Sequence, residues 1–300
     1  MKQKKWYGKD TGLSLRMVLT GAGLIIVYLA FLTLLSFYLD FVFLLIFAAL
    51  FVFIQFYFSD KLVLLSTGAK IVSPQEAPQL HTLVERLCTV ADLPKPRVAI
   101  INSQVPNAFA TGRNQKSAVV AVTTGLLNKL DTQELEAVLG HELTHVKNRD
   151  VLVITIASFL STVAWFIMRF FLYSSLFRGG SRNNKGAGAG IIIFLASLLV
   201  WLISYLLIRA LSRYREFAAD RGSAIMTGNP PALISALLKI SGAMQRVPTK
   251  DLREVEGLNA FFIIPALSGE SIMALFSTHP PIEKRIARLE VMERTLEGIR

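Results

Sequence analysis

The segment His141-Glu142-Leu143-Thr144-His145 requires an α-helix if its side chains are to act together. Histidines four positions apart lie on one face of a helix, so both imidazoles can converge on one cation. Glu142 projects to one side, where it can reach a water bound to that cation. Histidine pairs on helices are often ordinary core or surface groups. Here, however, two of the chain's 4 histidines stand in this spacing around a glutamate. The pattern predicts a zinc site with His141 and His145 as ligands.

A helix start lies directly before this segment. Asp131-Thr-Gln-Glu134 offers an N-cap carboxylate and, three residues later, a glutamate, which is the capping-box pattern. Apolar residues then recur at helical spacing as far as Val146. The sequence therefore predicts a helix that begins near residue 131 and carries both histidines.

A catalytic zinc ion needs a third protein ligand and one open position. Glu216-Phe-Ala-Ala-Asp220 supplies two carboxylates four residues apart, on a helix expected to begin after the last apolar run. Glu216 is the predicted third ligand. Asp220 is expected to accept a hydrogen bond from a ligand imidazole and so fix its tautomer. Without the histidine motif, the same two carboxylates among neighbouring arginines would read as a solvated face.

The composition is that of an integral membrane protein. Hydrophobic residues make up 53% of the 300 residues and charged residues 18%, against about 45–50% and about 25% in typical globular domains. The net charge of +11 comes without a basic stripe interleaved with aromatic residues, so we expect no nucleic-acid partner. A single cysteine, Cys88, excludes an internal disulfide. The expected surroundings are a lipid bilayer.

Four apolar runs are long enough, or nearly so, to cross about 30 Å of hydrocarbon. They cover residues 17–38, 41–58, 151–177 and 191–208. The first two are separated by so few residues that they must form a hairpin. The last two are joined by residues 178–190, which we interpret as a flexible glycine-rich loop.

Flanking charges predict the orientation of these runs. Residues 1–16 carry five basic side chains and one acidic side chain, so the positive-inside rule places the N-terminus in the cytoplasm. Two crossings then return the chain to the cytoplasm, and the second hairpin returns it again, so the C-terminus is also expected there. The basic residues of the 178–190 loop disagree with this orientation, since the loop would lie outside.

The polar segments predict a mixed fold. Helical spacing extends over residues 73–93, and short β-like runs follow at 97–101, 108–111 and 118–122. The predicted class is an α+β membrane protein, with about four transmembrane helices and a mainly helical cytoplasmic part that holds a small β-sheet. Its predicted segments are an N-terminal hairpin (1–60), a cytoplasmic region with the histidine helix (61–150), a second hairpin (151–208) and a second cytoplasmic region (209–300).

These motifs, followed by Thr278-His-Pro-Pro-x-x-x-Arg285, resemble in this order the HtpX-like membrane metalloproteases of the wider Ste24-type zinc peptidase family. The resemblance covers nearly the whole chain. It implies a zincin-type protease domain that binds one zinc ion per chain, with Glu142 as general base. It further implies an endopeptidase of the bacterial inner (plasma) membrane with a cytoplasmic active site. Its substrates would be misfolded or damaged membrane proteins, removed in quality control during stress.

The same resemblance assigns three further residues. Asn107, within Pro106-Asn-Ala-Phe-Ala-Thr111, would lie on a strand edge that holds the substrate backbone. The alternative is a turn residue after a proline. His279 and Arg285 would help to stabilise the tetrahedral oxyanion. Their alternative is a helix start, with Arg285 paired to Glu283 or Glu290.

Two other functions remain open from the sequence. A prenyl-protein endopeptidase belongs to the same superfamily, but such chains carry more spans, and four are too few for a large intramembrane chamber. A non-catalytic zinc-binding scaffold or transporter is the second alternative. Transporters place polar groups within their spans, whereas both motifs here lie just outside them.

Overall fold

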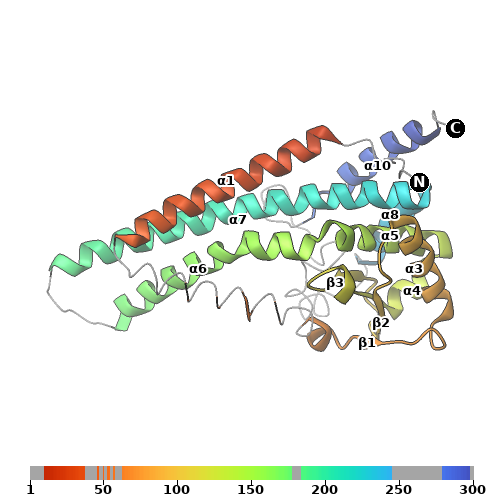
Figure 1. Cartoon of the computed structure of the whole chain (residues 1–300), viewed down its shortest axis with the longest axis horizontal. Helices are drawn as coiled ribbons and strands as arrows, with labels where there is room; N and C mark the ends of the chain where they lie inside the picture. The colour runs from red at the N-terminus through yellow and green to blue at the C-terminus, as the bar shows by residue number, and fades with distance from the viewer. Residues whose placement is uncertain are drawn as a thin grey trace. The chain divides into compact units, whose positions relative to one another are not determined.

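Figure 1 shows the computed structural model of the chain. It describes residues 10–37, 63–177, 184–244 and 279–297, together with residues 46, 50, 53, 54 and 57. The chain divides into two compact units. The first, here called the apolar unit, consists of Thr11–Tyr57 and Val153–Leu211. The second, the mixed unit, consists of Met1–Asp10, Phe58–Leu152 and Ser212–Arg300.

Long apolar helices make up the described part of the apolar unit. These helices are α1 (Thr11–Ser36) and the parts of α6 (Asp150–Phe177) and α7 (Asn184–Thr227) that fall in this unit, and they run side by side in Figure 1. Their contact surfaces bury apolar side chains such as Phe31 and Ala164, while Ile26 and others stay exposed. Each helix contains a stretch long and apolar enough to cross a membrane. A bundle with apolar side chains on its outside suits contact with lipid.

The predicted spans at 17–38, 151–177 and 191–208 fall on these three helices. The predicted span at 41–58 lies almost entirely outside the described residues. The count of four spans and the orientation of the chain therefore remain predictions.

Two expectations about α7 are wrong. Residues 184–190 belong to this helix, so the predicted glycine-rich loop is not a loop over that half, and residues 178–183 lie outside the described part. Glu216 also does not lie on a new helix, because α7 continues without a break from Asn184 to Thr227. The physical reason is visible in the sequence: residues 191–221 contain neither glycine nor proline, so nothing there ends a helix that has already formed.

A four-stranded sheet in the order β1-β2-β4-β3 supports the mixed unit. Its strands are β1 (Lys70–Ile71), β2 (Arg97–Ile101), β3 (Ala108–Thr111) and β4 (Val119–Thr123). β2 and β4 are parallel, whereas β3 runs antiparallel to β4 and forms one edge. The three predicted strands are confirmed within one residue. The two-residue β1, which pairs antiparallel with β2, was not predicted.

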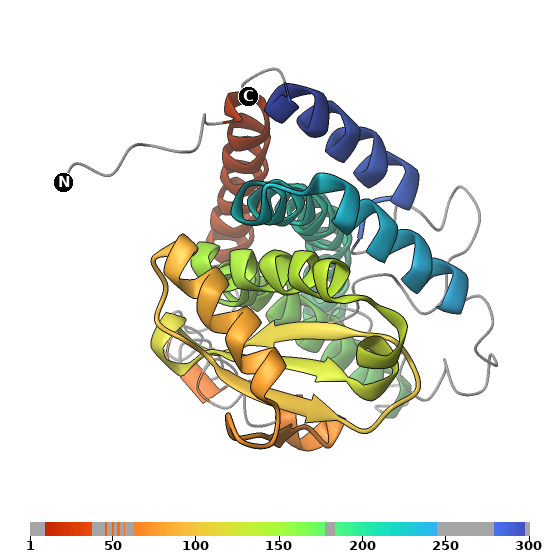
Figure 2. The same ribbon diagram turned by 90° about the vertical axis from the view of Figure 1, so that its right-hand side faces the viewer.

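Helices cover this sheet (Figure 2). Leu87 of α3 (Pro78–Ala91) and Leu139 of α5 (Thr132–Asn148) belong to one buried cluster with Val120 of the sheet. The cluster continues through Leu237 of α8 (Pro230–Met244) and Leu289 of α10 (Ile282–Glu297). Short elements α4 (Thr124–Lys129) and η1 (Gln115–Ser117) flank β4. This packing fixes α5, the helix that carries the histidines.

The predicted capping box at the start of α5 is confirmed. The Asp131 carboxylate accepts hydrogen bonds from the backbone N–H groups of Gln133 and Glu134, and Glu134 accepts one from the Asp131 N–H. Glu134 also accepts a hydrogen bond from Ser235 at 2.6 Å and pairs with Lys239, both on α8. One buried carboxylate therefore ties the first turn of α5 to a second helix.

Candidate metal centre

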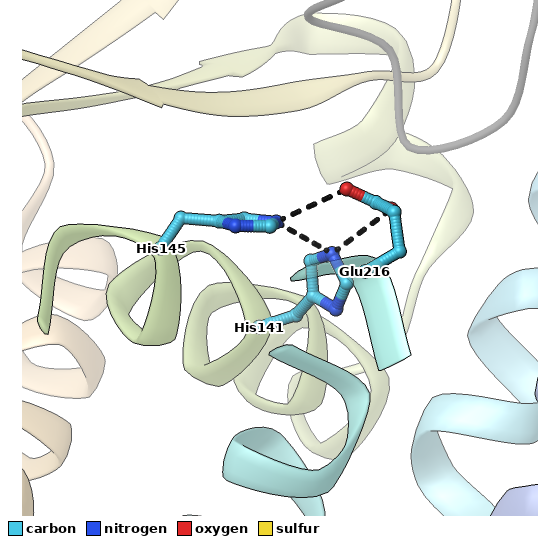
Figure 3. Close-up of side chains that lie close together, drawn as sticks. All are labelled: His141, His145 and Glu216. Carbon is cyan, nitrogen blue, oxygen red and sulfur yellow. Dashed lines mark hydrogen bonds and ion pairs between the residues drawn. The ribbon is translucent and has the colours of Figure 1, made fainter. Parts of the chain in front are cut away.

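Three side chains from two helices converge on one point (Figure 3). His141 and His145 project from α5, and Glu216 projects from α7. The two Nε2 atoms of the histidines lie 3.2 Å apart. Glu216 places Oε1 3.4 Å from the Nε2 of His145 and Oε2 3.7 Å from the Nε2 of His141. The predicted ligand set is thus assembled in space.

These separations fit a zinc ion. Imidazole nitrogens and carboxylate oxygens bind zinc at roughly 2.0–2.2 Å, so tetrahedral ligand atoms lie about 3.3–3.6 Å from one another. The observed separations of 3.2, 3.4 and 3.7 Å agree with this geometry. Two imidazoles and one carboxylate also form a donor set typical of a catalytic zinc site, which keeps its fourth position open.

Each ligand histidine has an aspartate on its other ring nitrogen. His141 donates its Nδ1–H to Oδ1 of Asp220 over 2.9 Å, and His145 donates its Nδ1–H to Oδ2 of Asp150 over 2.6 Å. With the proton fixed on Nδ1, the lone pair of Nε2 faces the other donor atoms in both rings. Sequence reasoning placed Asp220 beside a ligand histidine but missed Asp150. The available signal was an acidic residue at the point where the histidine helix gives way to an apolar run.

Two residues of the C-terminal motif contact the carboxylates of Glu216 and Asp220. His279 lies with Nδ1 2.8 Å from Oε2 of Glu216. Arg285 is 1% exposed and donates Nε and Nη2 to the two oxygens of Asp220, over 2.9 and 2.6 Å. Burial by itself lowers the pKa of Arg285, but Asp220 outweighs it and raises that pKa, so the guanidinium stays charged.

The acid–base character of α5 depends on this burial. Burial raises the pKa of Glu142, while the adjacent imidazoles of His141 and His145 oppose the rise. A backbone hydrogen bond from Ala110 on β3 also reaches this carboxylate. For His141, burial lowers the pKa, but the hydrogen bonds to Asp220 and Glu216 prevail and raise it. Glu142 therefore lies between the ligand set and the edge strand, with an increased affinity for a proton.

Asn107 stands immediately before the edge strand β3 and is buried. Its backbone N–H donates to Oγ1 of Thr123 and its carbonyl accepts from the Thr123 N–H, both over 2.9 Å. The backbone of Asn107 is thus held on β4 by the backbone and the hydroxyl of Thr123. The structure brings Asn107, Glu142 and the ligand set into one unit but does not test the substrate-binding role expected of Asn107.

The chain is similar to known proteins over most of its length. A family model described as Peptidase family M48 matches residues 74–293. Protease HtpX homolog 2 of Methanosarcina mazei is 60% identical over 295 residues, covering 98% of this chain and 99% of its own length. The Protease HtpX homolog of Moorella thermoacetica is 59% identical over the same shares. The crystal structure of S. mikatae Ste24p resembles this chain with a TM-score of 0.57. The similarity covers 95% of this chain and 67% of the Ste24p chain. At 19% identity that last similarity concerns the fold alone.

Proposed function

This chain belongs to peptidase family M48, as a membrane metalloprotease of the HtpX and Ste24 type, and we propose that it is a zinc endopeptidase with its active site on the cytoplasmic side. The observation that carries the proposal is the set of three donor atoms of His141, His145 and Glu216 at separations that fit one tetrahedral zinc ion. Glu142 lies next to this set, where a general base is needed.

The bound zinc ion would supply Lewis-acid activation of a water molecule and of the scissile carbonyl. Glu142 takes the proton of the attacking water and passes it to the leaving amine nitrogen. Its place beside both ligand histidines suits both steps, because one carboxylate there can accept the proton and return it. Burial of the site excludes bulk water from this exchange.

The edge strand offers the means of holding a peptide. β3 pairs on one side with β4, and in the described part of the chain no strand pairs with its other side, where an extended substrate would add a strand. We propose that the substrate backbone lies there, aligned near Asn107. His279 and Arg285 are proposed to meet the charge that develops on the substrate oxygen. His279 contacts the carboxylate of Glu216, and Arg285 contacts that of Asp220. These contacts would also fix the position of the proposed zinc ligands.

The proposed biological role is the removal of misfolded or damaged membrane proteins in the plasma membrane, which is the inner membrane in a bacterium. Three helices able to cross a bilayer support the membrane part of this role, and relatives named as proteases support the proteolytic part. Relatives of this kind occur in the archaeon Methanosarcina as well as in bacteria. The proposal therefore concerns the membrane that encloses the cytoplasm, in an archaeon as in a bacterium.

A proteolysis assay on the full chain in detergent tests the proposal. We expect cleavage of casein, loss of cleavage when a chelator removes the metal, and recovery on addition of zinc. The Glu142→Gln variant is the matched control, since it changes one atom of the proposed base. A wild-type protein that binds zinc without cleaving any peptide would support the scaffold alternative. Cleavage confined to prenylated peptides would support the prenyl-protein endopeptidase.

A further inference from the structure

His145 and Asp150 are held together by a hydrogen bond of 2.6 Å, and the carboxylate of Asp150 pairs on its other side with the guanidinium of Arg215. We propose that Asp150, clamped by Arg215, is the positioning residue that orients the zinc ligand His145. The inference rests on the proposed function, because it assigns a role toward the same metal. It adds a pair of residues to the site that neither the motifs nor their spacing had indicated.

The backbone makes this contact possible. Residues five apart in an uninterrupted helix point about 140° away from each other, so Asp150 on a continued α5 would face away from His145. Instead α5 ends at Asn148, Arg149 adopts a left-handed conformation (φ 56°, ψ 43°), and α6 begins at Asp150. Glycine is the usual residue at such a helix end. An arginine there costs roughly 1–2 kcal/mol, and this strained corner turns Asp150 back toward the His145 ring.

Arg215 fixes both sides of that corner. It is 6% exposed, pairs with Asp150, and donates Nη2 to the carbonyl oxygen of Asn148 over 3.1 Å. It also directly precedes Glu216 on α7, so one helical turn carries both the third ligand and the clamp. A displacement of Arg215 would therefore disturb two of the three ligands.

His145 and Arg215 contact different oxygens of the Asp150 carboxylate, Oδ2 and Oδ1. A carboxylate that pairs with a guanidinium accepts hydrogen bonds and donates none. His145 must then carry its proton on Nδ1, which leaves the Nε2 lone pair for the metal. Asp220 is likewise shared between His141 and Arg285, but both contact the same oxygen, Oδ1, and Nη2 of Arg285 comes within 3.5 Å of Nδ1 of His141. The structure thus contains two separate sets of histidine, aspartate and arginine, one for each imidazole ligand.

The test compares metal binding by the full-length wild type with binding by Asp150→Asn and Asp150→Ala in detergent. Apoprotein is titrated with Zn²⁺ against a chromogenic chelator, and the visible absorption of the Co²⁺-loaded protein reports ligand geometry. Loss of a hydrogen-bond partner behind a ligand histidine typically lowers metal affinity about 10–100-fold. We expect at least about tenfold for Asp150→Asn, a larger loss for Asp150→Ala, and an altered cobalt spectrum in both. Asp92→Asn, at the left-handed end of α3, is the matched control and should bind like the wild type.

Each outcome has one meaning. A wild type that binds no zinc contradicts the proposed function itself. A wild type that binds zinc while Asp150→Asn shows the same affinity and the same cobalt spectrum contradicts the positioning role alone. A purely structural role would lower the melting temperature but leave the cobalt spectrum of the folded variant unchanged, which also contradicts the proposal. If Asp150→Ala does not fold, Asp150→Asn decides.

Discussion

The Nδ1 of His141 lies 2.9 Å from Oδ1 of Asp220, on a different ring nitrogen from the Nε2 that faces the other ligand atoms. This hydrogen bond fixes the imidazole in the tautomer that leaves Nε2 available to a metal. Asp220→Asn should therefore lower zinc affinity about 10–100-fold while the chain still folds. Competition with a chelator and circular dichroism on the same preparation measure both. An unchanged zinc affinity would show that Asp220 has no part in holding His141.

Glu142 and Glu216 should separate into two roles. Glu216→Ala removes a ligand, so zinc and proteolysis should be lost together. Glu142→Gln removes only the proposed base, so about one zinc per chain should remain. Proteolysis should then fall about 10²–10⁴-fold, the usual contribution of proton transfer. Metal content by mass spectrometry and peptide cleavage are measured on both variants. The assignment fails if Glu142→Gln loses its metal or if Glu216→Ala keeps metal and activity.

The close approach of α5 and α7 should depend on Gly222. A Cβ atom added there would meet the side chain of Thr144 on α5, with its Cβ only 2.9 Å away. Gly222→Ala must therefore push the two ligand-bearing helices apart, which should lower both the melting temperature and the zinc affinity. Thermal unfolding and chelator competition measure the two effects.

Gly242 provides the matched control for that substitution. It also lies in a helix, α8, but no atom of the described residues stands within 4 Å of an added Cβ. Gly242→Ala should leave zinc affinity unchanged and raise stability by about 0.4–1 kcal/mol, because alanine favours the helix and restricts the unfolded chain. Equal effects of the two substitutions would contradict close packing at Gly222.

Stability should depend on pH through Glu134. Burial by itself raises the pKa of this carboxyl, but Lys239, Ser235 and the Asp131 N–H outweigh it and hold the pKa below its usual value. A depressed pKa means that the charged form stabilises the fold above the unfolded pKa of about 4.3 and that this stability is lost as pH falls through the folded value. Glu134→Gln should thus be less stable at pH 7, by about 1 kcal/mol or more, with the difference vanishing in acid.

Glu136→Gln is the comparison for Glu134. Glu136 pairs with the exposed Arg86, and surface pairs of this kind contribute roughly 0–1 kcal/mol. Denaturant unfolding of the apoproteins between pH 3 and pH 7 measures both variants. A constant difference between wild type and Glu134→Gln across that range would show that the buried carboxylate is not responsible.

Orientation in the membrane is tested by reporter fusions. A reporter after residue 300 and another within 100–120 should both report the cytoplasm, as the charges of residues 1–16 predict. A reporter within 182–186 should report the opposite side, or a buried position if the second hairpin does not fully span the membrane. A C-terminus on the far side of the membrane would contradict both the four spans and the cytoplasmic active site.

The features that were predicted correctly from the sequence depend on local signals. The capping box at Asp131, the histidine spacing on α5 and the three longer strands each depend on neighbours within a few residues, so they were predicted correctly. The continuity of α7 was not predicted correctly. The charged segment that follows the apolar run 191–208 was interpreted as the start of a new helix, although it contains no residue that ends a helix. β1 is defined only by pairing with β2, which a two-residue stretch cannot reveal.

Contacts between distant segments were the least predictable part of the site. Arg285 reaches Asp220 across 65 residues of sequence, and the sequence alone offered Glu283 or Glu290 as nearer partners. Asp150 reaches His145 only because Arg149 has a left-handed backbone conformation. Arginine seldom adopts this conformation, so the sequence did not predict it. Both contacts depend on backbone geometry that no residue spacing encodes.

The contacts of His279 and Arg285 with the carboxylates of Glu216 and Asp220 have a consequence for biosynthesis. During translation the two ligand histidines leave the ribosome long before the residues that hold their partners. At about 5–20 residues per second, the 144 residues from His141 to Arg285 (285 − 141) take about 7–29 s to make. A nascent chain therefore passes its membrane-inserting stage with an incomplete site, and proteolytic competence arrives only with the last part of the polypeptide.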